Sequence, residues 1–165
     1  MKYKFLFQKI DDLADRIATL GPACYLWKRD LSRFYLQLKI DPLEYDKLGF
    51  VWRGRLYLFV SFVWGRRHAG YCGQWLSSAV AYICKYLGLE KCGQPFFVLN
   101  YADDFAGAEA SKSTAELSFS TMGNLLEMIN LIESTEKASP PATRMTYLGV
   151  HFDTNQMCMY VDEVS

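Results

Sequence analysis

The chain has 165 residues, of which 51% are hydrophobic and 22% charged, with 18 basic and 18 acidic side chains and a pI near 6.7. This length and apolar fraction suit one globular domain with a buried core, and they exclude an intrinsically disordered chain. The longest strongly apolar run, from Leu56 to Trp64, is too short to cross a bilayer, and no signal-peptide pattern follows the basic N-terminus. We therefore expect an intracellular protein of the cytoplasm or nucleus, which is not secreted and has no membrane partner.

The five cysteines and the charge distribution give further limits. An odd number of cysteines without a C-x-x-C pair predicts neither a disulfide framework nor a zinc site. Residues 1–70 carry 13 basic and 7 acidic side chains, whereas residues 71–165 carry 5 and 11. One interpretation is a basic part that faces phosphates and an acidic part that holds metal ions; the other is chance scatter of solvated charges.

Hydrophobic periodicity predicts helices and strands that alternate without long linkers. In chain order, we expect a helix over 8–20, strands over 24–27, 35–40, 48–52 and 56–62, a helix over 74–87, strands over 96–99 and 105–108, a helix over 114–131, a loop over 133–143, and a closing hairpin of 145–152 with 157–161. The helix over 114–131 should bury a stripe of Leu117, Leu125, Met128 and Ile132. The tryptophans at 27, 52 and 64 are expected in the core. This pattern predicts an α+β fold in which helices pack on one face of a sheet.

Aspartates stand at the ends of two predicted strands. Asp103 and Asp104 occupy the turn between strands 96–99 and 105–108, and Asp30 follows strand 24–27. Because adjacent carboxylates repel and are costly to bury unpaired, such a pair is usually neutralised by divalent cations. With Asp30 on the neighbouring strand, three carboxylates could hold two Mg²⁺ or Mn²⁺ ions for in-line phosphoryl transfer. The alternatives are an ordinary Asp-rich turn for the pair and a helix N-cap for Asp30.

These aspartates lie in segments that resemble the motifs of reverse transcriptases. The stretch from Asp30 to Pro42, D-L-S-R-F-Y-L-Q-L-K-I-D-P, resembles motif A, and Tyr101-Ala-Asp-Asp104 resembles the Y-x-D-D box of motif C. The run from Leu48 to Tyr57 is similar to retrotransposon enzymes of the tyrosine-recombinase (DIRS) type. Lys137 and then Tyr147-Leu148-Gly149 follow in the order of motifs D and E.

The resemblance runs from about residue 20 to the C-terminus and implies a polymerase palm, a ferredoxin- or RRM-like antiparallel sheet with helices packed on one face. It implies one palm domain over 1–165 that transfers dNTPs to a primer 3′-hydroxyl on an RNA or DNA template, with two Mg²⁺ or Mn²⁺ ions. The N-terminal fingers strands and the thumb would be largely absent, so we expect fingers, thumb and RNase H domains in a longer polyprotein. The alternatives are a catalytically incompetent palm, the relic of a retroelement polyprotein, and another palm-type nucleotidyl transferase, which Tyr35 and the Y-x-D-D box disfavour.

The resemblance also implies roles for individual residues. The implied catalytic residues are Asp30, Asp103, Asp104 and Lys137, the last as a proton donor to pyrophosphate. The implied metal ligands are Asp30, Asp103, Asp104 and the Leu31 carbonyl. The implied dNTP-binding residues are Tyr35, Phe34, Gly65 and Gln74, with Tyr35 excluding a 2′-hydroxyl. The implied nucleic-acid contacts are Arg66, Arg67, Tyr101, Leu148 and Gly149.

Three of these assignments have plainer alternatives. Lys137 has a solvated lysine as its alternative, and Arg66 with Arg67 has a solvated loop. Phe34 and Tyr35 have ordinary core packing as theirs. The segment that corresponds to motif B keeps Gly65 and Gln74 but has Val63, Trp64 and Ala69-Gly70 in place of the family's Pro, Phe and Ser-Pro. Since this segment shapes the floor beneath the templating base, its departure counts against catalytic competence.

Overall fold

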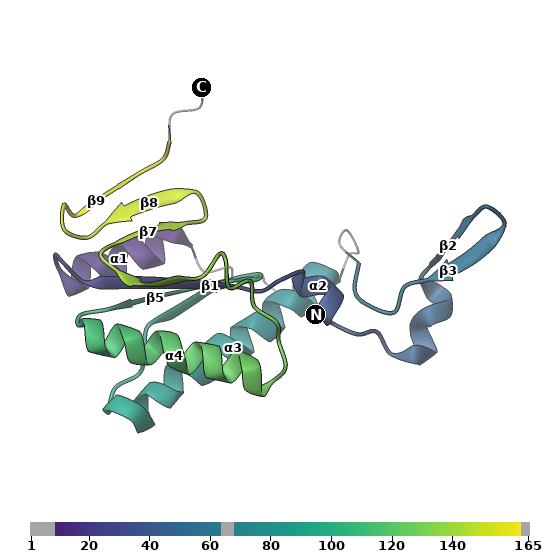
Figure 1. The fold of residues 1–165 in the computed structure, drawn as a ribbon, viewed down its shortest axis with the longest axis horizontal. Coiled ribbons are helices and arrows are strands. Elements are labelled where there is room, and N and C mark those ends of the chain that lie inside the picture. Colours follow the sequence, from purple (N-terminus) through teal and green to yellow (C-terminus); the bar gives the residue numbers. More distant parts are fainter. Residues whose placement is uncertain (1–8, 64–67, 163–165) are drawn as a thin grey trace, which may run out of the picture.

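The computed structural model describes residues 9–63 and 68–162, and its centre is a four-stranded antiparallel sheet with the order β4-β5-β1-β6 (Figure 1). The strands of this sheet are β1 (Tyr25–Asp30), β4 (Val98–Tyr101), β5 (Asp104–Glu109) and β6 (Ser139–Ala142). Strand β5 pairs antiparallel with both β4 and β1, which brings the end of β1 beside the β4–β5 turn. The α+β class that the sequence predicts is confirmed.

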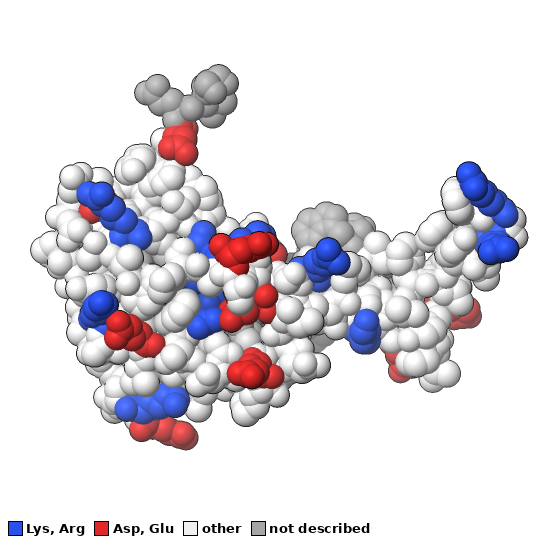
Figure 2. Space-filling model, viewed as in Figure 1, with Lys and Arg blue, Asp and Glu red and all other residues white. Residues whose placement is uncertain are grey.

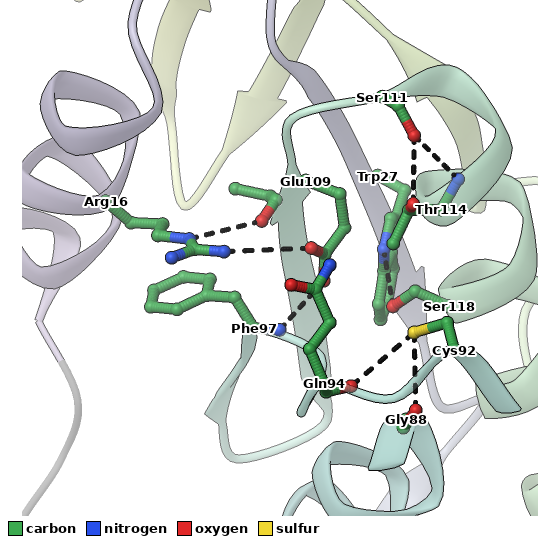
Figure 3. Close-up of polar contacts among 11 residues, drawn as sticks. Arg16, Trp27, Gly88, Cys92, Gln94, Phe97, Glu109, Ser111, Thr114 and Ser118 are labelled. Atoms are coloured by element: carbon green, nitrogen blue, oxygen red, sulfur yellow. Dashed lines mark hydrogen bonds and ion pairs between the residues drawn. The ribbon is translucent and has the colours of Figure 1, made fainter. Parts of the chain in front are cut away.

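Two helices, α3 (Ala69–Cys92) and α4 (Lys112–Met128), cover one face of the sheet, as expected (Figure 1). Trp27 is the largest side chain in the core beneath them, and it packs against Gly107 on the neighbouring strand. A Cβ atom at Gly107 would overlap the indole ring, so only glycine leaves room for it. The indole Nε1 donates a hydrogen bond to Ser118 Oγ at 3.1 Å, which joins β1 to α4 (Figure 3).

The opposite face of the sheet is covered by α1 (Ile10–Leu20) and a small three-stranded sheet. The strands of that sheet are β7 (Arg144–Tyr147), β8 (Val150–Asp153) and β9 (Cys158–Tyr160). Arg16 of α1 forms an ion pair with the buried carboxylate of Glu109 at 3.7 Å, and the same carboxylate accepts a hydrogen bond from the Phe97 backbone N–H at 2.8 Å (Figure 3). These contacts hold α1 and the Phe97 backbone against the end of β5 that lies farther from the aspartates.

An arm projects from this body (Figure 1). It consists of the 3₁₀ helix η1 (Pro42–Lys47) and a hairpin of β2 (Gly49–Trp52) and β3 (Arg55–Leu58). Arg53 and Gly54 connect the two strands with φ angles of 48° and 73°, the positive values that a two-residue turn of this kind requires. Figure 2 shows basic side chains at the tip of the arm, where Arg53 and Arg55 lie.

The segment predicted as a strand over 35–40 is instead a short helix, α2 (Phe34–Gln37). Tertiary contacts override the alternating pattern there. The Gln37 side-chain amide donates to the Ile132 carbonyl at 2.8 Å and accepts from the Ile132 N–H at 2.7 Å, which holds the turn against the segment after α4.

The C-terminal region also differs from the prediction. The expected strand over 145–152 is divided into β7 and β8 by a turn at Leu148-Gly149, where both φ angles are positive. The expected loop over 133–143 contains the edge strand β6, where the prolines are tolerated because an edge strand leaves some N–H positions unpaired.

Three predictions of burial are wrong. Trp52 is 54% exposed because both faces of the arm hairpin are solvated. Met128 is exposed because it is the last residue of α4 and lies outside the buried face of that helix, and Ile132 is exposed because it lies beyond the end of α4. Of the predicted stripe, Leu125 is buried and Leu117 packs against the core.

The cysteines at 24, 72, 84, 92 and 158 are free thiols, with Cys24 and Cys84 buried. Within residues 9–63 and 68–162, no helix is long and apolar enough to cross a membrane.

Candidate active site

The three aspartates singled out in the sequence meet at one end of the main sheet. Asp30 is the last residue of β1 and lies directly opposite Asp104, the first residue of β5, in the antiparallel register. Asp103 lies in the tight turn between β4 and β5, and its carbonyl accepts a hydrogen bond from the Leu31 N–H at 2.9 Å. The sheet therefore brings together carboxylates that are more than 70 residues apart in the chain.

The turn that carries Asp103 is held from behind by α3. Ala102 has a φ of 50°, a left-handed conformation that costs about 1–2 kcal/mol for a residue with a side chain. Its N–H donates to Oε1 of Gln74 at 2.8 Å, and the Gln74 amide donates onward to Ser78 Oγ at 3.3 Å. Gln74 thus positions the acidic turn, a role that its assignment as a dNTP contact did not include.

Mutual repulsion and burial shape the electrostatics of this cluster. Burial, and next to it the charge of Asp30, raises the pKa of Asp104 to about 7. Burial also raises the pKa of Asp103, with Asp30 contributing in the same direction. Burial followed by the charges of Asp104 and Asp103 raises the pKa of the nearby Tyr147 hydroxyl. These carboxylates carry more negative charge than their buried environment stabilises.

Two lysines face this charge from the described part of the chain. Nζ of Lys137 lies 3.2 Å from Oδ1 of Asp30, and this hydrogen bond raises the pKa of Lys137. Lys28 acts on Asp104 by its charge alone. Figure 2 shows acidic and basic side chains side by side near the middle of the face in view. The alternative that Asp30 caps a helix is not supported, because Arg33 stands at the N-cap of α2.

A cavity of about 360 Å³ opens beside the cluster. Its lining includes Lys28, Asp30, Asp104, Glu136, Lys137 and Tyr147 together with Leu148 and Gly149. The turn between β7 and β8, with Leu148 and Gly149, therefore borders Asp30 and Asp104.

The donor set suits a hard divalent cation in its chemistry, because Mg²⁺ prefers carboxylate and carbonyl oxygens. Within the described residues, however, no three His, Cys, Asp or Glu side chains already form a group that could hold a metal ion. Lys137 forms an ion pair with Asp30, so a cation bound to the Asp30 carboxylate would compete with the ammonium group.

The implied nucleotide-binding residues Phe34 and Tyr35 lie on α2, with their ring centroids 5.4 Å apart. Phe34 is buried in the core and packs beneath Tyr35. Tyr35 is half-buried, and burial and the charge of Asp103 raise the pKa of its hydroxyl. A Cβ atom at Gly73 would lie 3.0 Å from both rings, so a glycine at that position of α3 lets α2 approach closely.

The other implied contacts are distributed differently. Tyr101 is exposed at the end of β4, opposite Asp104. Gly65, Arg66 and Arg67 lie outside the described residues.

One element of the site was missed in the sequence. Arg29 is buried and donates to Glu133 Oε1 at 2.6 Å and to the Phe119 carbonyl at 3.0 Å, with its guanidinium carbon 3.7 Å from the centre of the Phe119 ring. Next to it, the Ser134 N–H donates to the Asp30 carbonyl at 2.8 Å. These bonds fix the segment that delivers Lys137. A signal was present, since an arginine inside a predicted core strand needs a buried partner.

The fold is similar to that of solved reverse transcriptases and telomerases. No protein-family model and no curated protein matches the sequence. The likeness is to solved structures. One is the foamy viral protease-reverse transcriptase in complex with double-stranded DNA, with a TM-score of 0.74 and 15% identity over 99% of this chain and 26% of that chain.

Two telomerases give similar values. The telomerase of Candida albicans, in complex with a fragment of telomeric RNA, has a TM-score of 0.69 and 13% identity over 95% of this chain and 34% of that one. The apo telomerase of Candida tropicalis has a TM-score of 0.66 and 15% identity over 94% of this chain and 40% of that one. The chain thus spans between about a quarter and two fifths of these polymerases.

Proposed function

We propose that this chain is the palm of an RNA-directed DNA polymerase, which adds dNTPs to the 3′-hydroxyl of a primer annealed to an RNA or DNA template. The observation that carries the proposal is the register of β1 against β5, which sets Asp30 opposite Asp104 with Asp103 in the adjoining turn. That carboxylate cluster lies on a fold of the reverse transcriptase type.

In this proposal, Asp30, Asp103 and Asp104 hold two Mg²⁺ or Mn²⁺ ions, with the Leu31 carbonyl as a further ligand. Such ions supply activation of the primer hydroxyl and neutralise charge on the phosphates. Gln74 keeps the acidic turn in place through Ala102. We further propose that Lys137, once released from its ion pair with Asp30, passes a proton to the leaving pyrophosphate, and that the ring of Tyr35, whose hydroxyl pKa is raised by burial and by the charge of Asp103, excludes a ribose 2′-hydroxyl.

The proposal extends to the setting of the domain. The Leu48–Tyr57 segment, which forms most of the arm hairpin, is the basis for placing the chain among retrotransposon enzymes of the DIRS type. The proposed setting includes fingers, thumb and RNase H domains in a longer polyprotein. Arg66 and Arg67 are proposed contacts for template phosphates.

A second candidate is a catalytically incompetent palm. The ion pair of Lys137 with Asp30, together with the lack of a preformed group of three ligating side chains among the described residues, favours it. In that case the ammonium group replaces the cations permanently, and the carboxylates serve only to hold the segment after α4.

The test is metal-dependent unfolding followed by primer extension. The wild type, Asp103→Asn and the control Asp15→Asn, an exposed position on α1, would be titrated with Mn²⁺ and Mg²⁺. An ion at about 100 times its Kd stabilises a folded protein by about 2.7 kcal/mol, so the melting temperature of the wild type and the control should rise, but not that of Asp103→Asn. Extension of oligo(dT) on poly(rA) by the wild type and not by Asp103→Asn establishes the enzyme. No response to metal contradicts the assembled site and supports the incompetent palm, in which Lys137 replaces the cations. Metal stabilisation without extension contradicts that replacement and means that the site binds metal but that this chain alone does not extend a primer.

A further inference from the structure

Helix α3 has an unusual distribution of side chains around its axis. Its buried face consists mainly of small residues: Ala69, Gly73, Ser77, Ala81, Cys84 and Gly88. The face that points away from the sheet carries larger ones: Trp75, Tyr82, Ile83, Tyr86 and Leu89, which are 68%, 63%, 45%, 42% and 47% exposed. A helix that covers a core normally has the reverse arrangement, because apolar side chains gain free energy when they are removed from water.

These five side chains form one continuous stripe, called here the outer stripe of α3. Trp75, Tyr82 and Leu89 recur at intervals of seven residues, and the Tyr82 and Tyr86 rings pack together with centroids 4.5 Å apart. Side chains at seven-residue intervals line one side of a helix and pair with a second helix that crosses at a small angle. The outer stripe therefore has the geometry of a helix–helix contact.

The area of the outer stripe is large enough for a protein interface. Its exposed parts add up to roughly 600 Å² of apolar surface, the upper limit of the largest patch on a typical monomer. Two such surfaces would bury roughly 1,200 Å², which is the lower limit of a stable, specific interface.

We propose that the outer stripe of α3 is the interface of a symmetric dimer, in which two copies of this chain pack their α3 helices antiparallel to one another. A two-fold axis at Tyr82 sets Trp75 of each copy opposite Leu89 of the other, so that the stripe meets itself, and Ser78 opposite Tyr86, so that a small residue meets a large one twice. The charged residues of α3 are Lys85, Glu90 and Lys91. In this pairing none of them falls opposite another charged residue of α3. Such self-complementarity is the mark of an interface between identical subunits.

The inference does not depend on the proposed polymerase activity, because it concerns the face of α3 that points away from the sheet and the acidic turn. Gln74, which holds that turn, lies on the buried face, whereas its neighbour Trp75 lies in the outer stripe. A dimer formed in this way leaves the cavity beside Asp30 open.

The test is the mass of the protein in solution at about 0.1 mM, where an interface of this size, with a Kd of micromolar order, is occupied. Sedimentation should give twice the chain mass of 19.0 kDa for the wild type and the single mass for Tyr82→Glu. The control Val51→Glu, at a position of the arm that is 71% exposed, should remain dimeric. Far-ultraviolet circular dichroism and a cooperative urea transition verify that each variant is folded. Leu89→Glu replaces Tyr82→Glu if that variant unfolds.

A mixing experiment tests the symmetry. Tyr82→Lys alone should be monomeric, and an equimolar mixture of Tyr82→Lys with Tyr82→Glu should recover the dimeric mass, because the two substituted positions meet near the axis. A monomeric wild type overturns the proposal and leaves another polymerase domain as the occupant of the stripe. A dimer that Val51→Glu dissociates and Tyr82→Glu does not also overturns it, in favour of the arm, and failure of the mixture to associate overturns the antiparallel pairing.

Discussion

Strand β5 has an acidic side chain at each end, and the surroundings of the two differ. Glu109 at one end accepts a hydrogen bond from the Phe97 N–H and pairs with Arg16 (Figure 3). Asp104 at the other end faces Asp30 across the strand pair and adjoins Asp103. Among the described residues, the cation that pairs with this cluster is the ammonium group of Lys137, which contacts Asp30 and whose side chain is 61% exposed. Burial raises the pKa at both ends.

The comparison separates a structural carboxylate from carboxylates that are available for a ligand. At the Glu109 end, a backbone donor and a guanidinium offset the loss of hydration, and the charge is needed to fasten α1 to the sheet. At the Asp104 end, like charges face one another, which a fold does not need for its own stability. The excess of charge at that end is therefore the feature to test.

The largest expected difference concerns activity. Asp30→Asn should lower primer extension by at least about 10²-fold, because one charged group is lost from a site that acts by electrostatic stabilisation. Glu109→Gln, at the other end of the sheet, should leave the extension rate unchanged. Single-nucleotide incorporation at matched protein concentrations measures both, and equal losses in the two variants would mean that the acidic cluster has no special role.

The next difference concerns stability. Glu109→Ala should lower the free energy of unfolding by about 2–3 kcal/mol, because it leaves the buried Phe97 N–H and the Arg16 guanidinium without their acceptor. Glu116→Ala, on the solvated side of α4, is the matched control and should have little effect. Urea denaturation gives both values. A loss of the same size in the control would contradict the structural role of Glu109.

The dependence of stability on pH tests the excess of charge at the Asp104 end. Since folding raises the pKa of Asp104 to about 7, the folded protein binds its proton more tightly than the unfolded chain does. In the metal-free protein, the contribution of Asp104 to the free energy of unfolding should therefore be fully present below pH about 4 and be lost as the pH rises to about 7. Asp104→Asn removes this contribution, so the slope of stability against pH should be shallower than that of the wild type. Identical slopes in thermal melts without metal would show that Asp104 titrates normally.

The smallest effect is expected for Lys137→Met. The lysine side chain is largely solvated, and pairs of this kind contribute little to stability because solvent and salt screen them. The urea midpoint should stay within error of the wild type, in contrast to Glu109→Ala. A clear decrease would mean that the ion pair with Asp30 is a structural clamp, as the incompetent palm requires.

The sequence was sufficient for the elements that carry the aspartates. The two strands that flank Asp103 and the strand that leads to Asp30 were predicted correctly because they are short apolar runs bounded by turn residues. The resemblance of motifs A and C then led to the correct expectation that the aspartates converge, which the register of β1 and β5 confirms.

The features that the sequence did not predict depend on contacts between residues that are distant in the chain or on the folded backbone. The helix at Phe34–Gln37 depends on hydrogen bonds from Gln37 to Ile132, which local alternation cannot indicate. The exposure of Trp52 follows from an arm that stands away from the core, whereas hydrophobicity alone predicts burial. The role of Gln74 depends on an unusual backbone angle at Ala102, a property of the folded turn.

The packing of Trp27 against Gly107 has a practical consequence for spectroscopy. Trp27 is enclosed by the core, whereas Trp52 and Trp75 are in contact with water on the arm and on α3. A collisional quencher such as acrylamide therefore reaches the emission of the latter two and spares that of Trp27. With Trp52, Trp64 and Trp75 replaced by phenylalanine, the remaining fluorescence would report solely on whether the interior between β1 and α4 is intact.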